Sequence, residues 1–130
     1  MIHEAVYSRL KNNAGVSALV GARVYPIKGE QAVTLPYIVY SRISVYGREI
    51  SHGNTTKAAK SRFQIDCYAK TPTQAAQISE AVVTAFHGWK GTVGSEKIFI
   101  SQVVDTQDAF DLDTNEYVVP VDVEIFHKEG

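Results

Sequence analysis

The spacing of apolar residues changes its period once within residues 62–89. Up to residue 69, apolar and more polar positions alternate: Phe63, Ile65, Cys67 and Ala69 against Arg62, Gln64, Asp66 and Tyr68. A period of two predicts a strand with one buried face. Beyond it, apolar residues recur every three or four positions and predict an amphipathic helix: Ala75, Ile78, Val82, Ala85, Phe86 and Trp89. Because the helical stripe needs a surface to cover, the segment predicts a helix packed on a sheet.

The predicted helix carries its own start and stop signals. Thr71 as N-cap, Pro72 in the first turn and Gln74 three residues after the cap match a capping box. Gly88 stands where a residue of positive φ ends a helix. We therefore expect a helix over about 72–88.

The rest of the chain predicts further strands and a short N-terminal helix. Apolar residues spaced by four begin the chain, residues 12–15 interrupt the pattern, and one more helical turn ends at Gly21. A brief strand is expected at 23–25, and longer ones at 36–45, 98–104 and 117–126. Pro120 lacks a backbone N–H, which predicts an edge strand or a bulge. The expected fold is α+β: one domain over 1–130, with a mostly antiparallel sheet on which the helix of about 72–88 and the short N-terminal helix pack.

Two long connections of opposite charge join these elements. Residues 46–60 hold Arg48, Lys57 and Lys60 against Glu49, and residues 105–116 hold five carboxylates and no Lys or Arg. On a chain of net charge -1, such loops are complementary to each other in a head-to-tail contact between copies. The hypothesis for subunit or partner contacts therefore names Arg48, Lys57, Lys60, Asp108, Asp111 and Asp113.

No catalytic or metal-binding motif stands out. Residues 111–115 imitate the start of a calcium loop, but Glu116 replaces the turn glycine. The histidines lie in separate elements, and Gly-x-Ser-x-Gly and phosphate-binding glycine motifs do not occur. A Ser–His–Asp triad stays an open alternative, because its members need not be adjacent in sequence. The expectation is a protein without catalytic, cofactor or metal sites, with Cys67 as a buried, inert thiol.

Composition limits the cellular location and the partners that we expect. No stretch approaches the ~20 apolar residues of a membrane span, and the start lacks the features of a secretory signal. The near-neutral net charge gives no footprint for sequence-specific nucleic-acid binding. We expect a protein that is intracellular or assembled inside a cell, without a membrane partner.

The order of motifs resembles a known family. The motifs are Val-Ser-Ala-Leu-Val-Gly-Ala-Arg-Val-Tyr-Pro at 16–26, Leu-Pro-Tyr-Ile-Val-Tyr at 35–40, the strand at 62–69 and the capped helix containing Ala75 and Ala76. This order resembles the tail-completion proteins of long-tailed bacteriophages and prophages, also called tail terminators or tail-to-head joining proteins. The resemblance covers nearly the whole chain, with residues 16–89 the most telling, and its motifs are structural.

The resemblance implies a small α+β subunit that forms a ring, typically a hexamer, at the head-proximal end of the tail tube. Such a ring would end tube polymerisation and present the head–tail joining surface, with the tail-tube protein and a neck or head-completion protein as partners. DNA would pass through it. The subunit would belong to the tail–neck region of the virion and to the host cytoplasm during assembly. The open alternatives are another neck or tail-tube component, or a small ligand-binding or enzymatic α+β domain.

Overall fold

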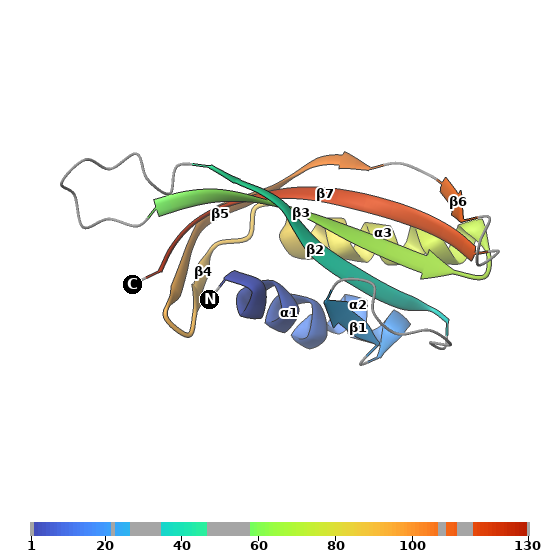
Figure 1. The fold of residues 1–130 in the computed structure, drawn as a ribbon. Helices are drawn as coiled ribbons and strands as arrows, with labels where there is room; N and C mark the ends of the chain where they lie inside the picture. Colours follow the sequence, from blue (N-terminus) through green and yellow to red (C-terminus); the bar gives the residue numbers. More distant parts are fainter. Residues whose placement is uncertain are drawn as a thin grey trace.

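In the computed structural model, three helices lie on one face of a single mixed β-sheet (Figure 1). The structure describes residues 2–21, 23–26, 35–46, 58–106, 109–111 and 116–129. The predicted α+β class is confirmed.

The sheet has seven strands among the described residues. Its order is β1-β2-β3-β7-β5-β4, and β6 pairs with β7 off this path. β1 runs parallel to β2, and the other described pairs are antiparallel. The strands are β1 (Val24–Pro26), β2 (Tyr37–Tyr46), β3 (Ala58–Ala69), β4 (Gly91–Val93), β5 (Glu96–Thr106), β6 (Ala109–Asp111) and β7 (Glu116–Glu129), and the helices are α1 (Ile2–Asn12), α2 (Ala14–Val20) and α3 (Pro72–Phe86).

The strand that contains Pro120 is central, so the prediction of an edge strand or a bulge at this residue is wrong. β7 lies between β3 and β5, and Pro120 pairs with Asp66 in an unbroken β3–β7 register. On its other side, the described pairing stops at Val121 with β5 and resumes at Val118 with β6. Pro120 is therefore accommodated in a central strand, where it supplies one backbone donor fewer than the other residues.

Local signals around α3 act as predicted, with two changes. Thr71 is the N-cap, and its hydroxyl accepts a hydrogen bond from the Gln74 N–H at 3.1 Å. The Gln74 side chain reaches back to the Lys70 N–H at 3.4 Å, one residue before the expected partner. The helix ends at Phe86 with His87 as C-cap, followed by Gly88 at φ 79°. Its last residue is therefore two positions before the predicted end.

The N-terminal helices are separated by one residue. Asn13 caps α2, its side chain accepting from the Val16 N–H at 3.1 Å, and Gly21 ends that helix with φ 61°. Tyr7 of α1 lies against Tyr40 of β2, and His3 meets the Phe63 ring edge-on. α1 is therefore tied to the sheet by side chains from its first two turns.

The two faces of the sheet differ in what covers them. On the inner face, beneath the helices, alternate residues of β3 and β7 are buried: Ala59, Ser61, Phe63, Ile65, Cys67, Ala69, Val119, Val121, Val123, Ile125 and His127. The alternation at 62–69 predicted this for Phe63, Ile65, Cys67 and Ala69. They join the apolar stripe of α3 in one core. Burial, followed by the Asp66 charge, raises the pKa of the Cys67 thiol, which confirms an inert core cysteine. On the outer face, a smaller cluster joins Tyr37, Val39, Tyr68 and Val118.

Several predicted connections are strands. β3 begins at Ala58, so Lys60 lies in a strand and not in the predicted loop. The stretch before residue 98 is a hairpin of β4 with the start of β5. β5 continues to Thr106, and β6 pairs with β7 inside the stretch expected to be an acidic loop. Backbone pairing with a neighbour overrides the weak local signal in these segments.

Candidate functional site

The structure brings together few of the predicted contact residues. Arg48, Lys57, Asp108 and Asp113 lie outside the described residues. For Asp111 the backbone alone is described, in β6 opposite Glu116. The proposed contacts of these residues stay predictions.

For Lys60 both the backbone and the side chain are described, and the residue lies on the outer face of β3. Its amino group lies 3.8 Å from a Glu124 carboxylate oxygen and 5.6 Å from the centre of the Phe126 ring. Both partners belong to β7 of the same subunit. Part of the Lys60 charge is therefore balanced within the fold, at a position that stays partly open to solvent.

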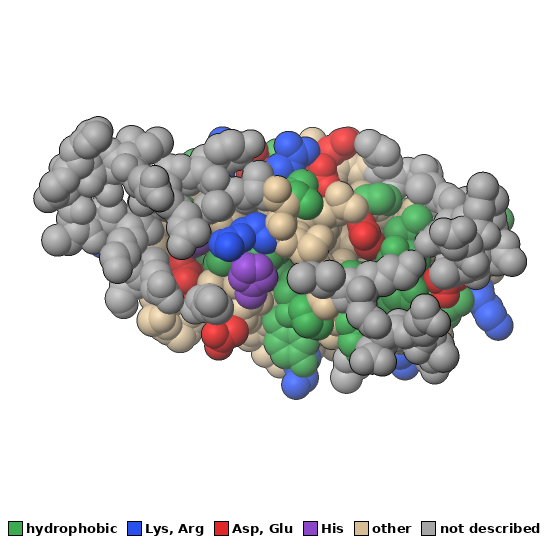
Figure 2. All heavy atoms as spheres, viewed as in Figure 1, with side chains coloured by type: hydrophobic (Ala, Val, Ile, Leu, Met, Phe, Trp, Pro, Cys, Tyr) green, Lys and Arg blue, Asp and Glu red, His purple; other side chains and the backbone are tan. Residues whose placement is uncertain are grey.

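The middle of the outer face is a polar band of paired charges. Arg62 donates to Asp122 at 2.8 Å, and Gln64 donates to Asp66 at 2.8 Å. Burial raises the pKa of the Asp66 carboxyl and the nearby Asp122 charge raises it further, against the lowering effect of the Gln64 hydrogen bond. On the face seen in Figure 2, acidic and basic side chains are interspersed over its described part.

Apolar side chains flank this band at both ends. At one end the Tyr37 and Tyr68 rings stack at 4.8 Å, and the Tyr37 hydroxyl donates to Glu116 at 3.0 Å. Tyr37 therefore packs within the sheet with a hydrogen-bonded tip. At the other end Ile100 and Phe126 are cross-strand partners, 47% and 38% exposed. Both side chains open to solvent beside the charged band.

Three polar residues form a chain on the inner face. Ser61 Oγ lies 2.7 Å from His127 Nε2, and His127 Nδ1 lies 2.7 Å from Glu96 Oε2. When Glu96 is ionised it accepts from Nδ1–H, so Nε2 accepts from the Ser61 hydroxyl. The order of hydroxyl, imidazole and carboxylate is that of a hydrolase triad.

Burial separates this trio from an active site. Ser61 is fully buried, and His127 and Glu96 are 6% and 2% exposed. A catalytic nucleophile has to meet its substrate, which this hydroxyl does not do in the folded chain. The trio satisfies polar groups inside the core and ties β3, β7 and β5 together.

The alternation of buried positions in the sequence indicates that all three residues of the trio are buried, although no sequence motif joins them. Ser61 continues the buried phase of β3, and His127 continues that of β7, two residues beyond Ile125. Glu96 likewise precedes the buried Ile98 by two. Extending each alternation by one step places all three residues on the buried face.

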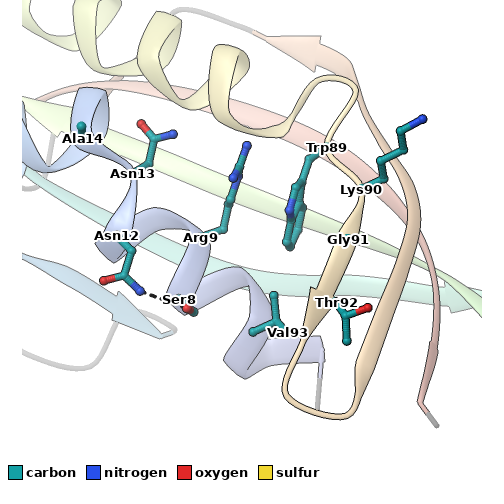
Figure 3. A pocket seen from close by; sticks show the side chains of 10 residues that line it. All are labelled: Ser8, Arg9, Asn12, Asn13, Ala14, Trp89, Lys90, Gly91, Thr92 and Val93. Atoms are coloured by element: carbon teal, nitrogen blue, oxygen red, sulfur yellow. Dashed lines mark hydrogen bonds between the residues drawn. The ribbon is translucent and has the colours of Figure 1, made fainter.

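A concavity lies between the end of α1 and the segment after α3 (Figure 3). It has a volume of about 430 Å³. Arg9 stands at its centre beside Trp89, and the Lys90 side chain points away from both. The lining residues are Ser8, Arg9, Asn12, Asn13, Ala14, Trp89, Lys90, Gly91, Thr92 and Val93.

The described part of the chain contains neither a metal-binding cluster nor a membrane-spanning helix. Within the described residues, no group of three or more His, Cys, Asp or Glu side chains is arranged to hold a metal ion. No helix of the described chain is long and apolar enough to cross a membrane.

Comparison with known proteins identifies the family. The model of the family described as tail completion protein gp17 matches residues 4–128. The chain belongs to this family. It is a bacteriophage tail-completion protein, a structural component of the virion, as the order of motifs predicted.

A solved structure shares the fold of this chain. A chain of the "Virion of native gene transfer agent (GTA) particle" superposes with a TM-score of 0.79 at 17% identity, covering 95% of this chain and 91% of that one. A search of curated proteins returned no match. The tail-completion chain and the GTA chain thus share an architecture at low identity.

Proposed function

We propose that this tail-completion protein assembles as a ring, a hexamer, on the head-proximal end of a phage tail tube. There it ends tube polymerisation and offers the surface that joins the head. The observation that carries the proposal is the family match over residues 4–128. The architecture shared with a chain of the GTA virion supports it.

The chain acts through contact surfaces and not through catalysis. The polar trio that resembles a triad is buried, and the outer face of the sheet carries exposed apolar side chains beside a band of charges. These features suit a subunit that binds other proteins. The partners proposed are other copies of the chain, the tail-tube protein and a neck or head-completion protein.

Contacts between copies are proposed to be head to tail. Arg48, Lys57 and Lys60 would meet acidic groups of a neighbour, among them Asp108, Asp111 and Asp113. A contact between two different surfaces repeats until it closes into a ring. Charge complementarity would set its register and make assembly sensitive to salt.

The test combines solution mass with tube capping. Light scattering over a concentration and salt series is expected to show a discrete ring that salt weakens. Electron microscopy with purified tail tubes is expected to show the protein at one tube end, with further tube growth stopped. Open-ended polymers would indicate a tail-tube component instead. A protein that neither closes into a ring nor caps tubes contradicts the proposal.

A further inference from the structure

The pocket between α1 and the segment after α3 contains a guanidinium that the fold holds in place. Arg9 Nε donates to the Ala85 carbonyl at 2.8 Å, within the last turn of α3. The guanidinium carbon lies 5.3 Å from the centre of the Trp89 ring, in a cation–π contact. One edge and one face of the group are therefore committed, and its orientation is set before any ligand arrives.

The two Nη groups of Arg9 remain available to a ligand. Among the residues that the structure describes, its two Nη groups make no hydrogen bond or ion pair. Two parallel N–H groups at the end of a guanidinium match the two oxygens of a carboxylate. Because Arg9 is already ordered, binding costs little side-chain entropy.

The charge of the pocket selects an anion. Its lining includes the Arg9 guanidinium and no Asp or Glu, while the Lys90 side chain points away from Arg9 (Figure 3). The end of α3 beside Arg9 contributes only about half a negative charge, so the guanidinium stays net positive. Other polar lining groups are engaged locally: Asn12 donates to Ser8 at 3.1 Å, and Asn13 caps α2.

The chain itself carries a matching ligand in residues 105–116. This stretch holds five carboxylates and no Lys or Arg. Within the same subunit, the described residues 109–111 of this stretch are remote from the pocket. Trp89 bonds to Ser101, opposite Ile125, whereas Phe110 lies opposite Tyr117. Eight residues of extended strand separate these two rungs, about 26 Å.

We infer that the pocket around Arg9 and Trp89 is a carboxylate-binding site that receives an acidic side chain from the 105–116 segment of a second copy. The pocket and residues 109–111 lie toward different ends of β7, so each subunit would place its acidic segment on one neighbour and receive that of another. Such a contact is head to tail and propagates around a ring. The inference rests on the proposed function for its partner, while the carboxylate site stands on the pocket's own geometry.

Trp89 is the single tryptophan of the chain, and its fluorescence reports directly on the pocket. The full-length subunit is titrated at low salt with a peptide of residues 105–116. A saturable change in fluorescence is expected, and substitution of the peptide's three central aspartates by asparagine is expected to abolish it. This arm uses the wild-type subunit, so it does not depend on a variant that folds. Equal binding of the asparagine peptide overturns the inference.

Variants of the pocket assign the binding to Arg9. Arg9→Gln is expected to weaken peptide binding about tenfold or more, since it removes a charge-assisted pair. Arg9→Lys keeps the charge but not the fork, and intermediate affinity is expected. Lys90→Gln is the matched control, because that side chain points away from Arg9, and less than about a threefold change is expected. A larger loss in Lys90→Gln than in Arg9→Gln contradicts the assignment.

Two further outcomes separate this inference from the proposed function. If a short DNA oligonucleotide, and not the acidic peptide, gives the saturable change, the site binds phosphate and the inference fails. If Arg9→Gln loses the peptide yet still forms rings and caps tubes, the pocket is not part of the subunit contact, and the proposed function stands. A wild-type chain that binds the peptide but neither closes into rings nor caps tubes keeps the carboxylate site and loses the proposed function.

Discussion

Two buried serines occupy the same rung of the sheet and differ in their hydrogen bonds. Ser61 on β3 and Ser101 on β5 both lie opposite Ile125, and both are fully buried. The Ser61 hydroxyl bonds to His127, whereas Ser101 Oγ has no partner among the described residues. The two serines share full burial and a cross-strand neighbour, so comparing them tests the contribution of the hydrogen bond to His127.

We therefore expect Ser61→Ala and Ser101→Ala to have opposite effects. Ser61→Ala leaves His127 Nε2 buried without a partner and should lower the free energy of unfolding by about 1–3 kcal/mol. Ser101→Ala removes a hydroxyl that is already unsatisfied, and stability should stay the same or rise. Urea denaturation of both variants measures the difference. Equal losses would show that the bond to His127 contributes nothing.

Asp66 shows how burial and a like charge affect one carboxyl of the outer face. The pKa of this carboxyl is raised in the folded chain, so its ionised form is disfavoured there. The resulting cost is fully present above the folded pKa and disappears as pH falls below the ordinary value of 3.8.

Asp66→Asn should therefore stabilise the protein at neutral pH. The amide oxygen still accepts from Gln64, while burial of a charge and repulsion from Asp122 are removed. The gain should be below about 1 kcal/mol at this partly exposed site, and it should vanish below pH 3.8. Urea unfolding at pH 7 and at successively lower pH tests it. A variant less stable than wild type at pH 7 contradicts the electrostatic account.

At the scale of elements, α3 depends on signals within its own first turn. The Thr71 hydroxyl satisfies the Gln74 N–H, one of the four donors that a helix start leaves unpaired. α3 covers β3, β5 and β7, so its loss would expose the core.

Thr71→Ala is expected to lower the free energy of unfolding by about 1 kcal/mol, the usual cost of losing an N-cap. Thr73→Ala makes the same chemical change two residues later, at an exposed position inside the helix. Because alanine favours helix interiors, that control should be neutral or slightly stabilising. Thermal unfolding compares the two, and equal effects would remove the capping role of Thr71.

β-Bulges decide which apolar side chains reach the surface. The register shifts between Arg42 and Ser44, between Ile98 and Ile100, and between Val103 and Asp105. The residues within these shifts are Ile43, Phe99 and Val104, and each is exposed. An extra residue in one strand turns its side chain out of the alternation. Three exposed apolar groups therefore arise from pairing irregularities and not from composition.

At the scale of the whole molecule, Lys60 is a proposed contact residue whose charge can be reversed with little harm to the fold. Lys60 pairs with Glu124 in a partly exposed ion pair, which contributes less than about 1 kcal/mol. Changing its sign should leave the subunit folded while it reverses the charge offered to a neighbour.

Reversal of both lysines, Lys57→Glu with Lys60→Glu, is expected to weaken ring formation or docking. Lys70→Glu makes the same kind of change at an exposed residue outside residues 46–60. This variant should assemble as the wild type does. Light scattering measures assembly, and circular dichroism confirms that both proteins fold. Wild-type assembly of the double variant would exclude these lysines from the contact.

The sequence by itself determined the helices and strands whose formation depends on residues close together in the chain. Alternation placed Phe63, Ile65 and Cys67 on a buried face, and Thr71 and Gly88 bounded α3, because strand period and capping depend on residues close in the chain. The order of motifs also indicated the family. The proposed contact residues remain predictions, since most lie outside the described residues.

Only the tertiary structure decided which strands are neighbours and which polar groups meet. β7 is central despite Pro120, because pairing along the rest of the strand places it between β3 and β5. Ser61 joins His127 across 66 positions of sequence, and Arg9 meets Ala85 across 76. Such contacts depend on strand register and helix docking, which no short stretch of sequence encodes. The buried trio and the Arg9 pocket therefore became visible only in the folded chain.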